Sequence, residues 1–255
     1  MSLTSPLHSR RVAAVTAAFD ASAPSYEAHA GVQRDVAARL ARLLPDLTRP
    51  RVLELGCGTG LFSRHLVERY PEGRFLLTDA APAMLAECRH NLTPALCSDI
   101  SFEIMDASRP GGEGPFDLIA SSMALHWVVE AAASLERLRA LLAPGGVLLY
   151  SALGPESFTE WRAVLEAEGL PSGLADLPSL PGTIEEERLT PDASALAFLK
   201  RIKAAGGLTP RDGYRPLPPG ALRRAIRAAD EAHGGRITWH IVYGRMVSNP
   251  STSPA

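Results

Sequence analysis

Apolar residues recur at helical spacing over residues 10–19 and 31–44, and short apolar runs replace that pattern from residue 51 onward. The short runs predict buried strands at 51–55, 75–78, 116–120 and 146–152, with a weaker strand near 101–105. The stretches between them predict helices at 61–70, 82–91 and 131–142. Strands that alternate with helices of about ten residues form βαβ units. The pattern therefore predicts an α/β fold whose sheet is mostly parallel, with helices on both faces.

The pattern becomes irregular after residue 154. Helices are predicted near 157–168, 192–205 and 219–232, a weak strand near 185–190 and a final strand over 237–246. Ser and Pro at residues 20–26 predict a loop or a broken turn. We expect the last two strands to form an antiparallel edge pair around a helical insertion. The predicted organisation is a helical cap (1–45), a core (46–154), an insertion (155–236), the final strand of the core sheet (237–246) and a disordered tail (247–255).

Composition narrows the class of protein. The chain has 255 residues, of which 46% are hydrophobic and 21% charged, and this is enough apolar material for a sizeable core. The net charge of −2 provides no overall basic field for nucleic acid or a membrane surface. The three cysteines, Cys57, Cys88 and Cys97, form no CxxC pair, which argues against a disulfide framework and a zinc site. This use of cysteine favours a reduced, cytoplasmic compartment, and no metal is expected. No apolar run reaches the length of a membrane helix.

One sequence motif indicates a ligand-binding loop. The sequence ELGCGTG (residues 54–60) lies between a predicted strand and a predicted helix, where glycines let the backbone turn sharply and approach a ligand. Its spacing is G-x-G-x-G, and Leu61 stands where a dinucleotide fingerprint would have Gly or Ala. Asp79 ends the next strand and could accept both ribose hydroxyls, and Asp106 follows the third strand and could accept from an adenine amino group. The alternative for both aspartates is helix capping. The glycine motif, Asp79 and Asp106 together predict an adenosine-containing ligand.

These residues resemble a known family. ELGCGTG, TDAAPAML (78–85), DA (106–107) and FDLIASSMALHW (116–127) are similar to the class I S-adenosylmethionine-dependent methyltransferases, with their Rossmann-like sheet and antiparallel last strand. The resemblance implies that Glu54 helps to hold the amino-acid end of the cofactor and that Asp79 holds the ribose. It implies that a segment containing Tyr26 folds over the cofactor. The expected cofactor-binding residues are Tyr26, Gln33, Glu54, Gly56, Cys57, Gly58, Gly60, Asp79, Ala80, Met84, Asp106, Ala107, Ser121 and Ser122.

Further blocks narrow the resemblance. AAFDASAPSYEAHAGVQRDVA (17–37), GGVLLYSALGPESFTEW (145–161), AFLKRIKAAG (197–206) and ITWHIVYG (237–244) resemble the malonyl-acyl-carrier-protein O-methyltransferases of biotin synthesis. The resemblance implies methylation of the free carboxylate of malonyl-acyl carrier protein or malonyl-CoA. The stretch 165–183 departs from the family pattern because it is short and rich in proline. A methyltransferase for a small acid of the trans-aconitate type, or a non-catalytic cofactor-binding module, remains as an alternative.

The expected chemistry explains why no general base stands out. A malonyl carboxyl has a pKa near ~4 and is already ionised at pH 7. The enzyme needs a cation for that carboxylate, and the candidates are Lys203, Arg211 and Arg215. His126 and Trp127 are interpreted as packing over the pocket, and Cys57 as a small filler of space. Gln33 either contacts the cofactor carboxylate or belongs to a solvated helix face.

Charge is unevenly distributed in the second half of the chain. Residues 195–245 carry ten basic and three acidic side chains, among them Arg223, Arg224 and Arg227 on one predicted helix. This is either a solvated surface or a basic face for an acidic partner. We expect a monomer that binds the carrier protein through this face.

Overall fold

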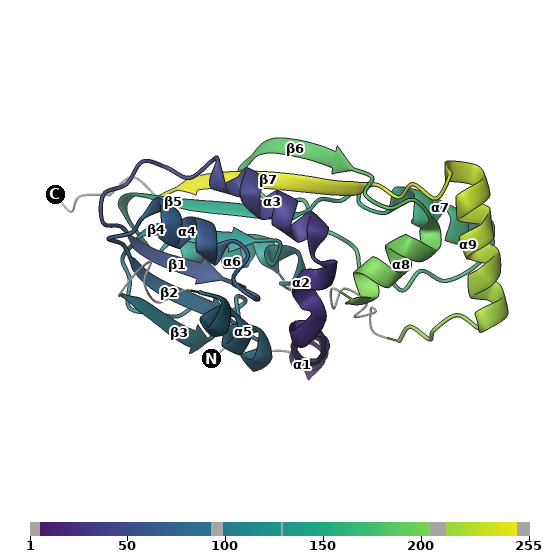
Figure 1. The fold of residues 1–255 in the computed structure, drawn as a ribbon, viewed down its shortest axis with the longest axis horizontal. Helices are drawn as coiled ribbons and strands as arrows, with labels where there is room; N and C mark the ends of the chain where they lie inside the picture. The colour runs from purple at the N-terminus through teal and green to yellow at the C-terminus, as the bar shows by residue number, and fades with distance from the viewer. Residues whose placement is uncertain (1–5, 93–98, 129, 205–212, 249–255) are drawn as a thin grey trace. The chain divides into compact units, whose positions relative to one another are not determined.

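The structure is a computed structural model that describes residues 6–92, 99–128, 130–204 and 213–248. Within these residues one sheet of seven strands has the order β3-β2-β1-β4-β5-β7-β6 (Figure 1). Its strands are β1 (Arg51–Leu55), β2 (Arg74–Asp79), β3 (Ile100–Ile104), β4 (Phe116–Ser122), β5 (Leu142–Leu153), β6 (Thr183–Leu189) and β7 (Trp239–Val247). The strands β1 to β5 pair in parallel and the end strands β6 and β7 are antiparallel, which confirms the predicted fold class.

The helices follow the predicted order. They are α1 (Pro6–Ser22), η1 (Ala23–Ser25), α2 (Tyr26–His29), α3 (Gly31–Ala41), α4 (Ser63–Arg69), α5 (Pro82–Asn91), η2 (Leu125–Trp127), α6 (Ala131–Arg139), α7 (Thr159–Ala167), α8 (Ala195–Ala204) and α9 (Pro219–His233). None of the helices that the structure describes is long and apolar enough to cross a bilayer.

The segment 20–26 is helical, and the prediction of a loop there was wrong. The helix α1 continues to Ser22, whose Oγ donates to the carbonyl oxygen of Phe19 at 3.0 Å. Pro24 lies in the first turn of η1. A proline is tolerated at that position, because the first amide groups of a helix have no partner within the helix. Ser and Pro therefore mark a change from one helix to the next.

The chain forms two compact units. Unit 1 contains Met1–Ala30, Leu153–Ser179 and Glu186–Ile241, and unit 2 contains Gly31–Ala152, Leu180–Glu185 and Val242–Ala255. The last strand, β7, runs to Val247, one residue past its predicted end, and most of the expected tail lies outside the described residues. The division into cap, core and insertion stays a prediction.

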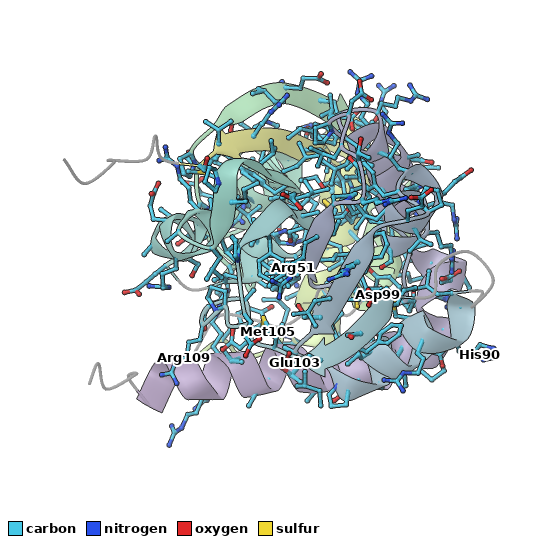
Figure 2. All side chains as sticks on the ribbon, turned by 90° about the vertical axis from the view of Figure 1, so that its left-hand side faces the viewer. Arg51, His90, Asp99, Glu103, Met105 and Arg109 are labelled. Atoms are coloured by element: carbon cyan, nitrogen blue, oxygen red, sulfur yellow. The ribbon has the colours of Figure 1, made fainter. Side chains whose placement is uncertain are left out.

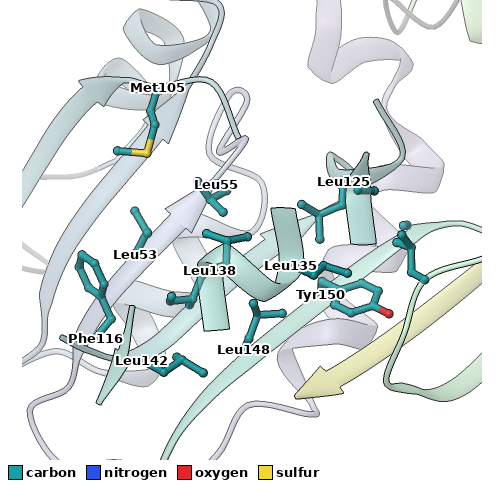
Figure 3. Close-up of a cluster of buried hydrophobic side chains, with 14 of the residues drawn as sticks. Leu53, Leu55, Met105, Phe116, Leu125, Leu135, Leu138, Leu142, Leu148 and Tyr150 are labelled. Carbon is teal, nitrogen blue, oxygen red and sulfur yellow. The ribbon is translucent and has the colours of Figure 1, made fainter. Parts of the chain in front are cut away.

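The core of unit 2 lies between the sheet and α6. Leu53 and Leu55 point from β1 to Leu135 and Leu138 of α6, and the whole group is buried (Figure 3). Because successive side chains of a strand alternate between its faces, Glu54 faces the opposite side. Helices α3 and α5 contact β4 and β2 in this unit, and α4 packs on α3. Such burial on both faces is expected of a parallel strand, and it fixes the loop that follows β1.

The strand β3 forms an edge of the sheet in unit 2. Figure 2 shows Asp99 and Glu103 along this edge, with Met105 after its last residue. The amide of Met105 donates to the carbonyl oxygen of Asp79 at 3.0 Å, so the chain after β3 is tied to the end of β2. Polar side chains that follow these two strands therefore lie at one edge.

Unit 1 has its own aromatic core. The ring of Phe158 lies 5.1 Å from that of Phe198 and 5.0 Å from that of Trp239, and Trp161 lies 6.3 Å from Phe198. Helix α9 packs on α7 and α8. This packing holds the second half of the chain in a defined arrangement, although its sequence pattern is irregular.

Candidate functional site

The glycine motif forms a tight loop between β1 and α4. The amide of Cys57 donates to the carbonyl oxygen of Thr78 at 2.9 Å, and the amide of Gly60 donates to the carbonyl oxygen of Cys57 at 2.9 Å. Gly56, Gly58 and Gly60 have φ values of 66°, 55° and 91°. Side chains with a Cβ rarely adopt such values, so the loop requires glycine for its conformation.

Gly56 and Gly58 differ in what surrounds them. A Cβ on Gly56 would lie 2.4 Å from the Cβ of Ala124, so the chain after β4 packs directly on the loop. A Cβ on Gly58 would meet no atom within 4 Å. Gly56 therefore permits close packing, and Gly58 leaves open space above the backbone where a ligand could approach.

Asp79 ties the loop to the end of β2. Its Oδ2 accepts from the amide of Gly58 at 2.9 Å, and its Oδ1 accepts from the amide of Ala81 at 2.8 Å. The side chain stays half-buried. The aspartate thus has a local structural role, as the capping alternative expects, and its oxygens retain lone pairs for hydroxyl donors.

Glu54 is a fully buried carboxyl beneath the loop. Its Oε2 accepts from the Oγ of Ser63 at 2.6 Å, while Oε1 has no hydrogen-bond partner. The pKa of Glu54 is raised from 4.5 to about 8, mainly by burial; the bond from Ser63 lowers it and the nearby charge of Asp79 raises it within this net value. At pH 7 this carboxyl is therefore mostly protonated, and a cationic group beside its unsatisfied oxygen would favour the ionised form. Ser63 could not be found from the sequence, because its contact with Glu54 arises only from tertiary packing.

Two free thiols lie at the loop, Cys57 within it and Cys88 beside Gly60. Cys57 and Cys88 are both buried, and the Sγ of Cys88 lies 3.7 Å from the Oγ of Ser63. The contact with Cys88 and burial raise the pKa of the Cys57 thiol well above its ordinary value. A protonated, buried thiol is a poor nucleophile. The geometry therefore agrees with Cys57 as a filler of space.

Asp106 and Ala107 follow β3 at the same edge. The Oδ1 of Asp106 accepts from the amide of Ser108 at 2.8 Å, and Arg137 of α6 donates to the carbonyl oxygen of Ser108 at 3.0 Å. Asp106 and Ala107 are both half-buried. These bonds hold the chain after β3 in place beside the end of β2.

The end of β4 completes this edge of the sheet. The Oγ of Ser121 is buried and donates to the carbonyl oxygen of Leu55 at 3.0 Å, while the Oγ of Ser122 lies 3.3 Å from that of Ser151. His126 is buried next to Trp127, and burial lowers the pKa of His126 to about 3. The imidazole is therefore neutral at pH 7 and cannot act as a cationic acid there.

The other predicted site residues have different surroundings. Met84 is buried in α5, Ala80 is half-buried, and Gln33 of α3 has a buried Oε1 without a hydrogen-bond partner. Tyr26 belongs to unit 1, as do the exposed side chains of Lys203 and Arg215. Arg211 lies outside the described residues.

The arrangement in unit 2 suits a nucleoside ligand with a cationic end. Carboxylates follow β2 and β3, the backbone is open at Gly58, and a buried carboxyl lies beneath the loop. Parallel α/β sheets bind ligands at this carboxyl edge. Among the described residues no group of three or more His, Cys, Asp or Glu side chains could hold a metal ion.

Comparison with known proteins identifies the family. Residues 52–146 match the family described as a methyltransferase domain. A malonyl-[acyl-carrier protein] O-methyltransferase from Magnetococcus marinus is 37% identical over 86% of this chain and 87% of its own length. The chain belongs to the malonyl-[acyl-carrier protein] O-methyltransferase family. It is therefore an S-adenosylmethionine-dependent methyltransferase.

Other relatives agree with this family. The bifunctional biotin biosynthesis protein BioCD of Bordetella avium is 38% identical over 89% of this chain and 50% of its own length. The crystal structure of YcgJ from Bacillus subtilis superposes with a TM-score of 0.60 at 14% identity, covering 85% of this chain and 99% of that one. A likeness at that identity supports the fold alone.

Proposed function

We propose that this methyltransferase transfers a methyl group to the free carboxylate of malonyl-acyl carrier protein in early biotin synthesis. The observation that carries the proposal is the 37% identity to the Magnetococcus marinus enzyme, because it extends over 86% of the chain and therefore beyond the methyltransferase domain match. Nothing in the described part of the chain favours a small free acid such as aconitate. The free thiols of Cys57 and Cys88 suit the cytosol, where thiols stay reduced, and we expect a monomer.

We assign the cofactor to the carboxyl edge of unit 2. The backbone is open at Gly58, Asp79 is half-exposed beside it, and Glu54 has a buried oxygen without a partner. These features fit S-adenosylmethionine, with Asp79 accepting from the ribose and Glu54 near the cationic amino-acid end. Further proposed contacts come from Asp106 and Ala107 after β3 and from Ser121 and Ser122 at the end of β4.

The protein's contribution to the reaction is placement and exclusion of water. S-adenosylmethionine, when bound, supplies an electrophilic methyl group on a sulfonium. The acceptor carboxylate is ionised at pH 7 and needs no base, so the chain must bring the reacting atoms to about 3–3.5 Å in line. The exposed ammonium of Lys203 or guanidinium of Arg215 is our candidate for holding that carboxylate, together with Arg211 outside the described residues.

Methyl transfer from labelled S-adenosylmethionine tests the proposal directly. The purified chain is assayed with malonyl-carrier protein, malonyl-CoA and trans-aconitate in parallel. We expect label in the two malonyl thioesters, in base-labile ester form, and none in aconitate. Transfer to aconitate alone would overturn the proposal in favour of a small-acid enzyme. Binding of S-adenosylhomocysteine without transfer to any acceptor would indicate a non-catalytic binding module.

A further inference from the structure

Helix α9 has one buried side and one charged side. Ala221, Ala225 and Ala229 are buried at successive turns, and they fix the helix in unit 1. Arg223 and Arg227 are both exposed, and each lies about 200° around the helix from the alanine two positions before it. The packing of the helix therefore forces these two guanidinium groups toward solvent. We refer to Arg223 and Arg227 as the α9 arginine pair.

The α9 arginine pair forms no ion pair within 4 Å of a described residue. Neighbouring cations differ in this respect: Arg224 lies 3.7 Å from Glu168, and Arg201 lies 2.8 Å from the buried Asp192. Glu231 follows Arg227 by one turn and forms no ion pair with it in the described structure. The charges of Arg201 and Arg224 are thus balanced by ion pairs within unit 1, whereas the α9 arginine pair forms no such ion pair with a described residue.

The stability of the isolated helix does not explain why arginines stand at both positions of the α9 arginine pair. Like charges four residues apart destabilise a helix by a few tenths of a kcal/mol. Cations stabilise a helix near its C-terminus, but Arg223 is the fifth and Arg227 the ninth of 15 residues. Nearby Lys203, in contrast, lies in the last turn of α8, where the helix dipole favours it. An anionic surface that approaches α9 would relieve the repulsion between Arg223 and Arg227.

We propose that the α9 arginine pair is a docking site for the acidic surface of the acyl carrier protein. The inference rests on the proposed function, because the occupant is the carrier that presents the malonyl group. Acyl carrier proteins are acidic, so the charges are complementary. Exposed charges at the rim of an interface act mainly on the association rate, over a Debye length of about 8 Å at physiological salt. The pair should therefore affect the encounter with the carrier and leave methyl transfer itself unchanged.

Steady-state kinetics of the double variant Arg223→Glu, Arg227→Glu tests this. We expect the KM for malonyl-carrier protein to rise at least about tenfold at low salt, with kcat unchanged. Both parameters for malonyl-CoA should stay within about twofold, since that substrate lacks the acidic protein surface. The difference between variant and wild type should shrink as salt is raised. Binding of holo-carrier protein, measured by calorimetry, should weaken in parallel.

A control variant on unit 2, with the same change in net charge as the α9 double variant, tests whether any reversal of two surface cations has the same effect. Arg49 and Arg74 are exposed and pair locally with Glu72 and Asp99, so the variant Arg49→Glu, Arg74→Glu reverses two cations on unit 2. The milder variant Arg223→Ala, Arg227→Ala addresses misfolding, and it should show a smaller change in the same direction. An equal effect of the control, or an equal loss with malonyl-CoA, would overturn the docking site. Unchanged kinetics of both α9 variants would overturn it as well, and would leave the proposed function intact. A wild-type protein inactive on both thioesters would overturn the proposed function and the docking site together.

Discussion

The buried carboxyl of Glu54 should make the stability of the protein depend on pH. Its pKa is about 8 in the native state, against 4.5 for an ordinary glutamate. Between these values the native state keeps a proton that the unfolded state has lost. The stabilisation from this proton is complete below pH 4.5, and it is lost as pH rises through about 8.

The magnitude follows from these two pKa values. Raising the pH from about 6 to about 8.5 should lower the free energy of unfolding by about 2–3 kcal/mol through Glu54 alone. Glu54→Gln has nearly the same shape, can accept from Ser63 and carries no charge at either pH. Its stability should lack this decrease, so the difference between the two proteins isolates Glu54. Histidines such as His126 titrate in both proteins and cancel in the difference.

Urea unfolding at fixed ionic strength, followed by circular dichroism at several pH values, measures the effect. Ser63→Ala provides a second test, because removing its hydrogen bond should raise the pKa of Glu54 further and move the transition to higher pH. If the unfolding free energies of wild type and Glu54→Gln run parallel from about pH 6 to pH 8.5, the reasoning is wrong. Glu54 would then be ionised in the folded protein, with a partner for Oε1.

The sequence predicted the part of the fold that local pattern determines. Strand β1 was predicted with its observed bounds, because four of its five residues are buried and Val52, Leu53 and Leu55 form a short apolar run that only Glu54 interrupts. Strand β5 was predicted from residue 146, but it begins at Leu142. Pro144 and Gly145 conceal its first part, and the register with β4 shifts between Phe116 and Leu118. A bulge of this kind is set by the neighbouring strand, which the local pattern does not contain.

The candidate site likewise has residues that the sequence pattern predicted and residues that only the tertiary structure shows. The glycine loop and Asp79 were visible because strand, turn and helix follow one another directly in the chain. Ala124 and Ser63 were missed, although each contacts a residue of the motif, since both contacts arise from tertiary packing. The candidates for the substrate carboxylate were chosen only by residue type and by resemblance. Ion pairs elsewhere in this half of the chain, such as that of Arg224 with Glu168, depend on the packing of α7 on α9 and have no signature in the sequence.

Three further predictions concern the glycine loop and the N-terminal helices. Asp79→Ala should weaken binding of S-adenosylhomocysteine at least about tenfold, because a hydrogen bond to a charged acceptor is worth about 1.5–3 kcal/mol, and unchanged affinity by calorimetry would contradict the assignment. Residues 6–30, which include Tyr26, should gain protection from hydrogen exchange when S-adenosylhomocysteine binds, and full protection without ligand would indicate a fixed cap. Gly56→Ala should lower the free energy of unfolding by about 2–3 kcal/mol, through a φ of 66° and a Cβ placed 2.4 Å from that of Ala124. Adding Ala124→Gly removes the collision but leaves the backbone strain, so the double variant should recover about half of the loss in urea unfolding. Strict additivity of the two substitutions would show that the chain after β4 does not pack on the loop.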